Sequence, residues 1–283
     1  MLLVLTMPLP ARAAVWIRDF QGEPTEYRLE RNGQPLPVQY YQTLQPGDRL
    51  WVETHRVLRL EFDDGSVVAV KPADSPYTVQ DTGAAPGVLA NLIAWAGGWL
   101  QTHAETTVSL VARSDGATIT LPLIPVPPAR LEAGTRTLSL AWSGGKPPFQ
   151  VSLERQADKI VVLNEPGVTL ERFSSPPLDL IPGLYELAIL DGRGAKTVAS
   201  IEVVTAAELP AAPGELAAAA GADSLKATVH ALWLAAQGEP WLLEAYQRIS
   251  PWREQHEPAR WLMDSLEKGI RPPPPGQAVQ DGG

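Results

Sequence analysis

Short runs of alternating apolar and polar residues fill the first part of the chain, as is typical of half-buried β-strands. Turn signals separate the runs. Asn32-Gly33 is a strong hairpin signal, and Pro46-Gly47-Asp48 precedes the alternating run Arg49–Thr54. The pattern predicts a β-domain over residues 15–83.

The most informative run surrounds a loop of two aspartates and a glycine. A three-residue loop, Asp63-Asp64-Gly65, would pair Leu58 with Val70 and Leu60 with Val68. A two-residue loop would turn both valines to the charged face, because a shift of one residue reverses every side chain. We therefore predict the longer loop, with its glycine in the left-handed region.

The same loop could supply oxygen ligands to a cation through Asp63, Asp64 and Ser66. A Ca²⁺ site needs roughly six to eight oxygens, which is more than this loop offers. Turn chemistry accounts for the cluster, because aspartate binds nearby backbone N–H groups and glycine supplies positive φ. We expect no metal here.

These segments together resemble a FecR-type β-domain. The resemblance is carried by Gly47–Val52, Leu58–Ser66 and Val70–Pro72, which match a Gly-Asp turn, an alternating strand and a "DGS" hairpin that ends near a proline. Members near the namesake pass signals to a sigma factor through a cytoplasmic part and a membrane helix, a role that we do not expect here. The motif brings no catalytic residues.

The segment Pro86–Leu100 has helical spacing and is apolar almost all round, which predicts a buried linking helix over residues 84–103. Three interpretations stay open. The helix could lie between two β-domains, bind a partner or span a membrane. The first is favoured. The span is least favoured, because the apolar run is shorter than the ~20 residues that a bilayer requires.

Nine tryptophans are many for 283 residues. Trp95 and Trp99 lie at i and i+4 on the apolar helix and are the best candidates for a partner surface, where aromatic residues are enriched. Packing within the protein is the favoured alternative for this pair. Four more follow apolar periodicities and are expected in cores: Trp51, Trp142, Trp233 and Trp261.

Strand patterns resume over residues 104–204. Thr106–Val111 and Thr118–Leu123 flank the hairpin signal Ser114-Asp115-Gly116, and further strands follow at Leu138–Trp142 and Phe149–Leu153.

The part from Leu138 to Val204 resembles a bacterial immunoglobulin-like or PKD-type β-sandwich. The residues that carry the resemblance are Trp142, the Gly-Gly-x-Pro-Pro turn, Pro182–Tyr185 and Asp191-Gly192. Tyr185 lies where such folds place a tyrosine whose hydroxyl binds the preceding corner. The strands Glu186–Leu190 and Lys196–Val204 keep matching faces only across a loop with an odd number of residues.

Residues 205–270 are predicted to be helical, and residues 271–283 to be a disordered tail. Asp223 or Ser224 can cap a helix that runs to Gln237, while Pro240 and Pro258 suit the first turns of two more. Gly269 could end the third of these helices.

Charge and composition exclude several function classes. The net charge of −9 argues against nucleic acid as a partner and against binding to anionic lipid through a basic patch. The absence of cysteine excludes disulfides and thiolate chemistry. The four histidines are far apart and no HExxH, GxSxG or phosphate-loop motif occurs. We therefore expect no catalytic residues, no metal and no cofactor.

The N-terminus indicates export. An apolar run, Leu2–Leu9, precedes Ala11-Arg12-Ala13, which is an A-x-A cleavage pattern. Residues 1–14 are interpreted as a signal peptide, with a start upstream of Met1 as the explanation for its missing basic end.

The sequence thus predicts a mainly β, multidomain protein: a FecR-like β-domain, a linking helix, an immunoglobulin-like sandwich and a C-terminal helical region. The expected function is that of a non-enzymatic, periplasmic or otherwise exported component of the cell envelope that binds or scaffolds another envelope protein, with sensing or signalling left open. A carbohydrate- or cell-wall-binding accessory protein is the alternative. Association with the membrane stays open, though not through a transmembrane span.

Overall fold

The computed structural model describes residues 14–80, 87–104, 118–217 and 223–276. The chain divides into two compact units, unit 1 (Met1–Gln101) and unit 2 (Thr102–Gly283), and each is described by itself. Residues 1–13 of the expected signal segment and the hairpin at Ser114-Asp115-Gly116, with the strand Thr106–Val111, lie outside the described residues.

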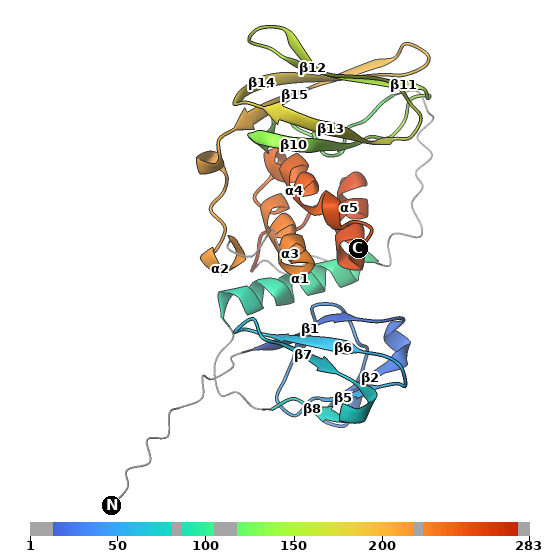
Figure 1. Cartoon of the computed structure of the whole chain (residues 1–283), viewed down its shortest axis with the longest axis vertical. Coiled ribbons are helices and arrows are strands. Elements are labelled where there is room, and N and C mark those ends of the chain that lie inside the picture. Colours follow the sequence, from blue (N-terminus) through green and yellow to red (C-terminus); the bar gives the residue numbers. More distant parts are fainter. Residues whose placement is uncertain (1–13, 81–86, 105–117, 218–222, 277–283) are drawn as a thin grey trace, which may run out of the picture. The chain divides into compact units, whose positions relative to one another are not determined.

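Unit 1 contains two four-stranded antiparallel sheets (Figure 1). The first has the order β4-β1-β6-β7 and consists of β1 (Val15–Phe20), β4 (Thr43–Leu44), β6 (Leu58–Phe62) and β7 (Val67–Val70). The second has the order β3-β2-β5-β8 and consists of β2 (Tyr27–Arg31), β3 (Gln34–Leu36), β5 (Arg49–Val52) and β8 (Tyr77–Thr78). Short 3-10 turns occur at Pro24–Glu26 and Pro72–Asp74.

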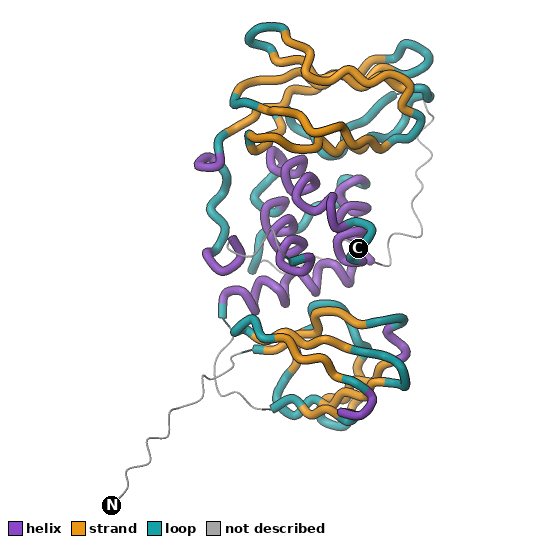
Figure 2. The backbone as a smooth tube through the Cα atoms, viewed as in Figure 1, coloured by secondary structure: helices purple, strands orange, loops and turns teal. Residues whose placement is uncertain are grey.

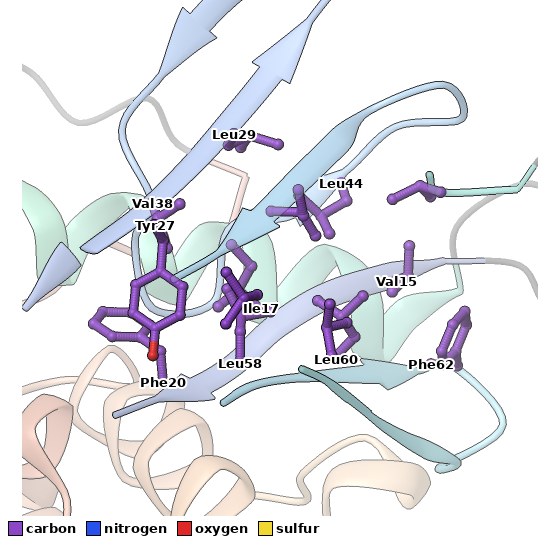
Figure 3. Packing of buried hydrophobic residues seen from close by; sticks show 14 residues of the cluster. Val15, Ile17, Phe20, Tyr27, Leu29, Val38, Leu44, Leu58, Leu60 and Phe62 are labelled. Atoms are coloured by element: carbon purple, nitrogen blue, oxygen red, sulfur yellow. The ribbon is translucent and has the colours of Figure 1, made fainter. Parts of the chain in front are cut away.

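The core of unit 1 lies between these sheets because alternate residues of each strand point inward. Figure 3 shows Ile17 of β1 and Leu58 and Leu60 of β6 on one side of this core, with Leu29 of β2 on the other. All four are fully buried. Leu50 of β5 joins the same cluster.

The β6–β7 hairpin has the predicted register. Leu58 pairs with Val70 and Leu60 with Val68. The Gly65 N–H donates to the Phe62 carbonyl at 2.8 Å, and Gly65 has a φ of 78°. These contacts confirm the predicted three-residue loop, Asp63-Asp64-Gly65. Only a loop of this length keeps Val68 and Val70 on the same face as Leu58 and Leu60.

The apolar segment forms α1 (Val88–Ala104). A Cβ atom on Gly97 would lie 3.1 Å from the Tyr41 Cβ atom. The glycine therefore permits a close approach of the helix to the chain at Tyr41. Gln101 Nε2 donates to the Tyr40 carbonyl at 3.3 Å. None of the described helices is long and apolar enough to cross a bilayer.

Unit 2 begins with a two-layer β-sandwich, whose layers are visible in Figure 2. One sheet pairs β10 (Gly134–Ala141) with β13 (Arg172–Leu180). The other has the order β12-β11-β14-β15-β9 and consists of β9 (Ala129–Glu132), β11 (Phe149–Arg155), β12 (Ile160–Val168), β14 (Gly183–Leu190) and β15 (Lys196–Val204). The expected strand Thr118–Leu123 is reduced to one bridge, Thr120 to Ser143.

The sandwich has an immunoglobulin-like corner. The Tyr185 hydroxyl donates to the Ile181 carbonyl at 3.0 Å and accepts from the Ile181 N–H at 3.2 Å. In the β14–β15 hairpin Leu187 faces Ala199, across the five-residue loop 191–195. Both the corner tyrosine and the odd loop agree with prediction.

The C-terminal helical region is also confirmed. It contains α2 (Gly214–Ala217), α3 (Ser224–Ala235), α4 (Leu242–Ile249) and α5 (Glu257–Glu267), with 3-10 turns at Ala206–Glu208, Glu239–Trp241 and Ser250–Trp252. Asp223 caps α3 by accepting from the Leu225 and Lys226 N–H groups. The mainly β fold class with this helical region is therefore correct.

Helix α4 packs directly on the sandwich, against β9 and β10 (Figure 1). Gln247 Oε1 accepts from the Ser139 N–H at 2.6 Å, and Gln247 Nε2 donates to the Ser139 carbonyl at 2.7 Å. Glu244 is fully buried and binds Arg136 at 2.8 Å. Gln247 thus takes the place of a neighbouring strand for the N–H and carbonyl of Ser139 in β10.

Candidate functional site

The outward face of the β3-β2-β5-β8 sheet carries a tryptophan. Leu50 and Val52 of β5 are buried in the core, so Trp51 between them points to the opposite face, where it is half-buried. The expectation that Trp51 belongs to a core is therefore wrong, because the period of the strand places it outside. Of the other three tryptophans assigned to cores, Trp142 and Trp233 are buried, while Trp261 is half-buried.

Two arginines cover the Trp51 ring. The guanidinium carbon of Arg28 lies 4.7 Å from the ring centroid, and that of Arg49 lies 4.9 Å from it. Arg28 is directly opposite Trp51 on β2, while Arg49 lies two residues before it on β5. Both distances fall within the range of an attractive cation–π contact. Strand pairing therefore fixes the cations beside the aromatic ring.

The charges of this face are only partly balanced. Arg28 binds Glu30 at 2.8 Å, although its side chain is 62% exposed. Arg49 is exposed and, among the described residues, has no carboxylate at ion-pair distance. Two arginines against one glutamate leave a local charge of +1 in a chain whose net charge is −9. Thr78, exposed opposite Arg49 on β8, completes what we call the Trp51 surface: Arg28, Arg49, Trp51 and Thr78.

This surface has the chemistry of recognition. It offers a planar apolar ring, guanidinium donors and an open sheet face. Its residue types include no side chain that titrates near neutral pH. No group of three or more potential metal ligands occurs among the described residues. The arrangement can bind a partner of complementary shape and charge.

The sequence pointed instead to Trp95 and Trp99 of α1. Trp99 is 1% exposed, whereas Trp95 is half-buried. The Trp95 indole Nε1 is buried without a hydrogen-bond partner among the described residues. Partner binding by this pair stays a prediction, with Trp95 the more accessible of the two.

Unit 2 has a cavity of about 250 Å³ beside the start of β13. Its lining consists of Trp142, Leu170, Glu171, Arg172 and Glu267. Arg172 Nε donates to Glu267 at 2.9 Å, and the Tyr246 hydroxyl donates to the same carboxylate at 2.7 Å. Burial, followed by the nearby Glu267 charge, raises the pKa of Tyr246 well above its usual range. Arg172 and Glu267 already bind one another, while the buried Trp142 Nε1 has no hydrogen-bond partner among the described residues. Because its arginine is already paired, this cavity is the weaker candidate.

No protein-family model matches the chain, and no curated protein matches it. A solved structure, the crystal structure of the ZIG-8-RIG-5 IG1-IG1 heterodimer in its monoclinic form, is similar to 37% of this chain and 96% of its own, at 10% identity and a TM-score of 0.20.

Proposed function

We propose that this protein is a non-enzymatic, exported component of the cell envelope that binds or scaffolds another protein through the Trp51 surface. The observation that carries the proposal is one half-buried tryptophan on an outer sheet face under two arginines, one of which has no carboxylate partner among the described residues. Tryptophan and arginine are the residues most enriched at the energetic centres of protein interfaces.

The shape of the face supports a protein rather than a small molecule. Small ligands prefer concave pockets that enclose most of their surface. Trp51 lies on the outer face of a sheet, where a partner can make contact over a wide area. The net charge of −9 also disfavours nucleic acid as a partner.

The resemblance to a FecR-type β-domain is part of this proposal. Its Gly47–Val52 segment contains β5, and its Leu58–Ser66 segment contains β6 and the loop that follows it. Trp51 therefore lies within the resembling segment. The N-terminal A-x-A pattern supports export to the periplasm, with sensing or signalling as one outcome of the binding.

Carbohydrate or cell-wall binding is the second candidate, and the half-buried aromatic ring of Trp51 on the outer sheet face favours it. A sugar ring would stack on the face of the indole. The guanidinium groups of Arg28 and Arg49 already lie over that ring, so a sugar would have to displace one of them. A protein partner can instead contact the stacked arginines as they lie.

The test is affinity purification from an envelope extract, followed by titration of the recovered protein against purified variants. We expect Trp51→Ala to weaken that complex by roughly tenfold or more, as is usual for a tryptophan at an interface centre. Trp252→Ala is the matched control, since Trp252 is also half-buried but lies in unit 2. An equal affinity of both variants and the wild type, or recovery of chaperones only, would contradict the proposal.

A further inference from the structure

We infer that the Trp51 surface takes an acidic peptide segment, one carboxylate of which pairs with Arg49. This inference rests on the proposed function and adds the chemistry of the partner. It follows from how differently the two arginines of the surface are satisfied.

Arg28 already has an anionic partner. Its Nη2 atom donates to Glu30 at 2.8 Å, and it also stacks on Trp51. Glu30 lies opposite Arg49 in the strand register, yet it binds Arg28. The carboxylate opposite Arg49 in the register is thus already bound by Arg28.

Arg49 is held in place without being neutralised. It lies 4.9 Å from the Trp51 centroid, and among the described residues it makes neither a side-chain hydrogen bond nor an ion pair. A guanidinium group carries its N–H donors in its own plane and stacks through its face. Contact with the ring therefore restrains the group while its donors stay free for a carboxylate, which they match in a two-pronged geometry.

The rest of the chain favours a short-range contact over general attraction of anions. A net charge of −9 repels polyanions at long range, but that repulsion is screened beyond roughly 8 Å at physiological salt. A suitable ligand therefore places one carboxylate at Arg49 and an apolar side chain beside the indole. An extended peptide with alternating acidic and apolar residues meets both demands on the outer face of a sheet.

The experiment measures fluorescence anisotropy of two labelled peptides, Glu-Leu-Glu-Leu-Glu and Gln-Leu-Gln-Leu-Gln, with the full chain. We expect the wild type to prefer the glutamate peptide by about threefold or more, the range of one exposed charge pair. Arg49→Gln should abolish the preference. Its fold is checked by the unfolding curve, so that loss of binding is not loss of structure.

Arg130→Gln is the matched control. Arg130 also lies over a tryptophan, 5.7 Å from the Trp241 centroid, but it is already paired with Glu202 at 2.9 Å. Both variants change the net charge equally, so a nonspecific charge effect would appear in both. We expect this control to keep the wild-type preference.

Several results would overturn the inference: no binding of either peptide, equal binding of both, or equal effects of the two arginine variants. Retention on purified cell-wall polymer that requires Trp51, without a peptide preference, would assign the surface to a glycan. A recovered protein partner that needs Trp51 but binds Arg49→Gln as tightly as the wild type would overturn the acidic peptide alone and leave the proposed function standing.

Discussion

Two tryptophans of this protein lie under arginine side chains, and they differ in what each arginine binds next. In unit 2 Trp241 is 7% exposed, and the arginine over it, Arg130, is paired with Glu202 at 2.9 Å. In unit 1 Trp51 is half-buried, and Arg49 over it has no such partner among the described residues. The same pair of residue types is internally satisfied in one place and open to a partner in the other.

Other arginines of the protein are also paired with carboxylates inside their own unit. In unit 2 two arginines of the sandwich form ion pairs with helices. Arg136 binds Glu244 of α4, and Arg172 binds Asp264 of α5. Unit 1 also contains an internal ion pair, in which Arg31 binds the buried Asp48 at 2.7 Å. A charged side chain is therefore informative about function where its fold leaves it unpaired.

The largest expected effect is on stability at Glu244. Glu244→Ala should lower the unfolding free energy of unit 2 by about 3 kcal/mol, because it leaves a mostly buried Arg136 unpaired. Chemical unfolding monitors it. Glu254→Ala is the control, since Glu254 is 89% exposed and 3.8 Å from Arg253, and it should change stability little. Similar losses of stability in the two variants would contradict a structural role for the buried Glu244–Arg136 pair.

A second prediction concerns the acid sensitivity of unit 2, through the buried His230. Burial, and secondarily the charge of Arg248, lowers the pKa of His230 to about 4. The folded state therefore favours the neutral ring, so its contribution is complete above the unfolded pKa near 6.5 and is lost as pH falls toward 4.

Unit 2 should accordingly lose up to roughly 3 kcal/mol of stability from this group between pH 6.5 and 4. His230→Gln should remove that part of the pH dependence, as measured by urea unfolding across the range. His55→Asn, at an exposed histidine of unit 1 with a φ of 66°, should keep the wild-type profile. Parallel profiles of wild type and His230→Gln would contradict the assignment.

A third prediction tests the docking of α4. Gln247→Ala leaves the N–H and carbonyl of Ser139 without their side-chain partner and should cost about 2 kcal/mol. Amide hydrogen exchange at Ser139 should rise in the variant. Unchanged exchange would mean that this glutamine does not protect the β10 backbone.

The smallest effect on stability is expected at the open site. Arg49→Gln should change the unfolding free energy of unit 1 by no more than about 1 kcal/mol, because the exposed side chain makes no ion pair within the described residues and loses only its contact with the Trp51 ring. Thermal unfolding measures it. A loss similar to that of Glu244→Ala would show that Arg49 is structural and would remove the contrast with unit 2.

The features that the sequence predicted correctly depend on residues close together along the chain. The loop at Asp63-Asp64-Gly65 had one solution that kept Leu58 and Leu60 on the face of their partners, and the structure has that register. The corner at Tyr185 and the cap at Asp223 were equally local. Each depends on residues only a few positions apart.

Other features required tertiary information. Gln247 meets Ser139 across 108 residues, which no local pattern encodes. Trp51 is different, because the alternation of Leu50 and Val52 already placed it on the outer face, and the hydrophobic character of its ring wrongly outweighed that parity. Its contact with Arg28 further depends on how β2 and β5 align, which sequence spacing alone does not determine.

Site-specific photo-crosslinking tests the Trp51 surface most directly. A photoreactive amino acid replaces Thr78, which is exposed opposite Arg49, or Ala69, which is exposed on β7 of the other sheet of unit 1. The full chain is irradiated in its native envelope. We predict a discrete protein adduct from position 78 that disappears in Trp51→Ala, with none from position 69. The same adducts from both positions, or an adduct at position 78 that survives Trp51→Ala, would contradict binding through this surface.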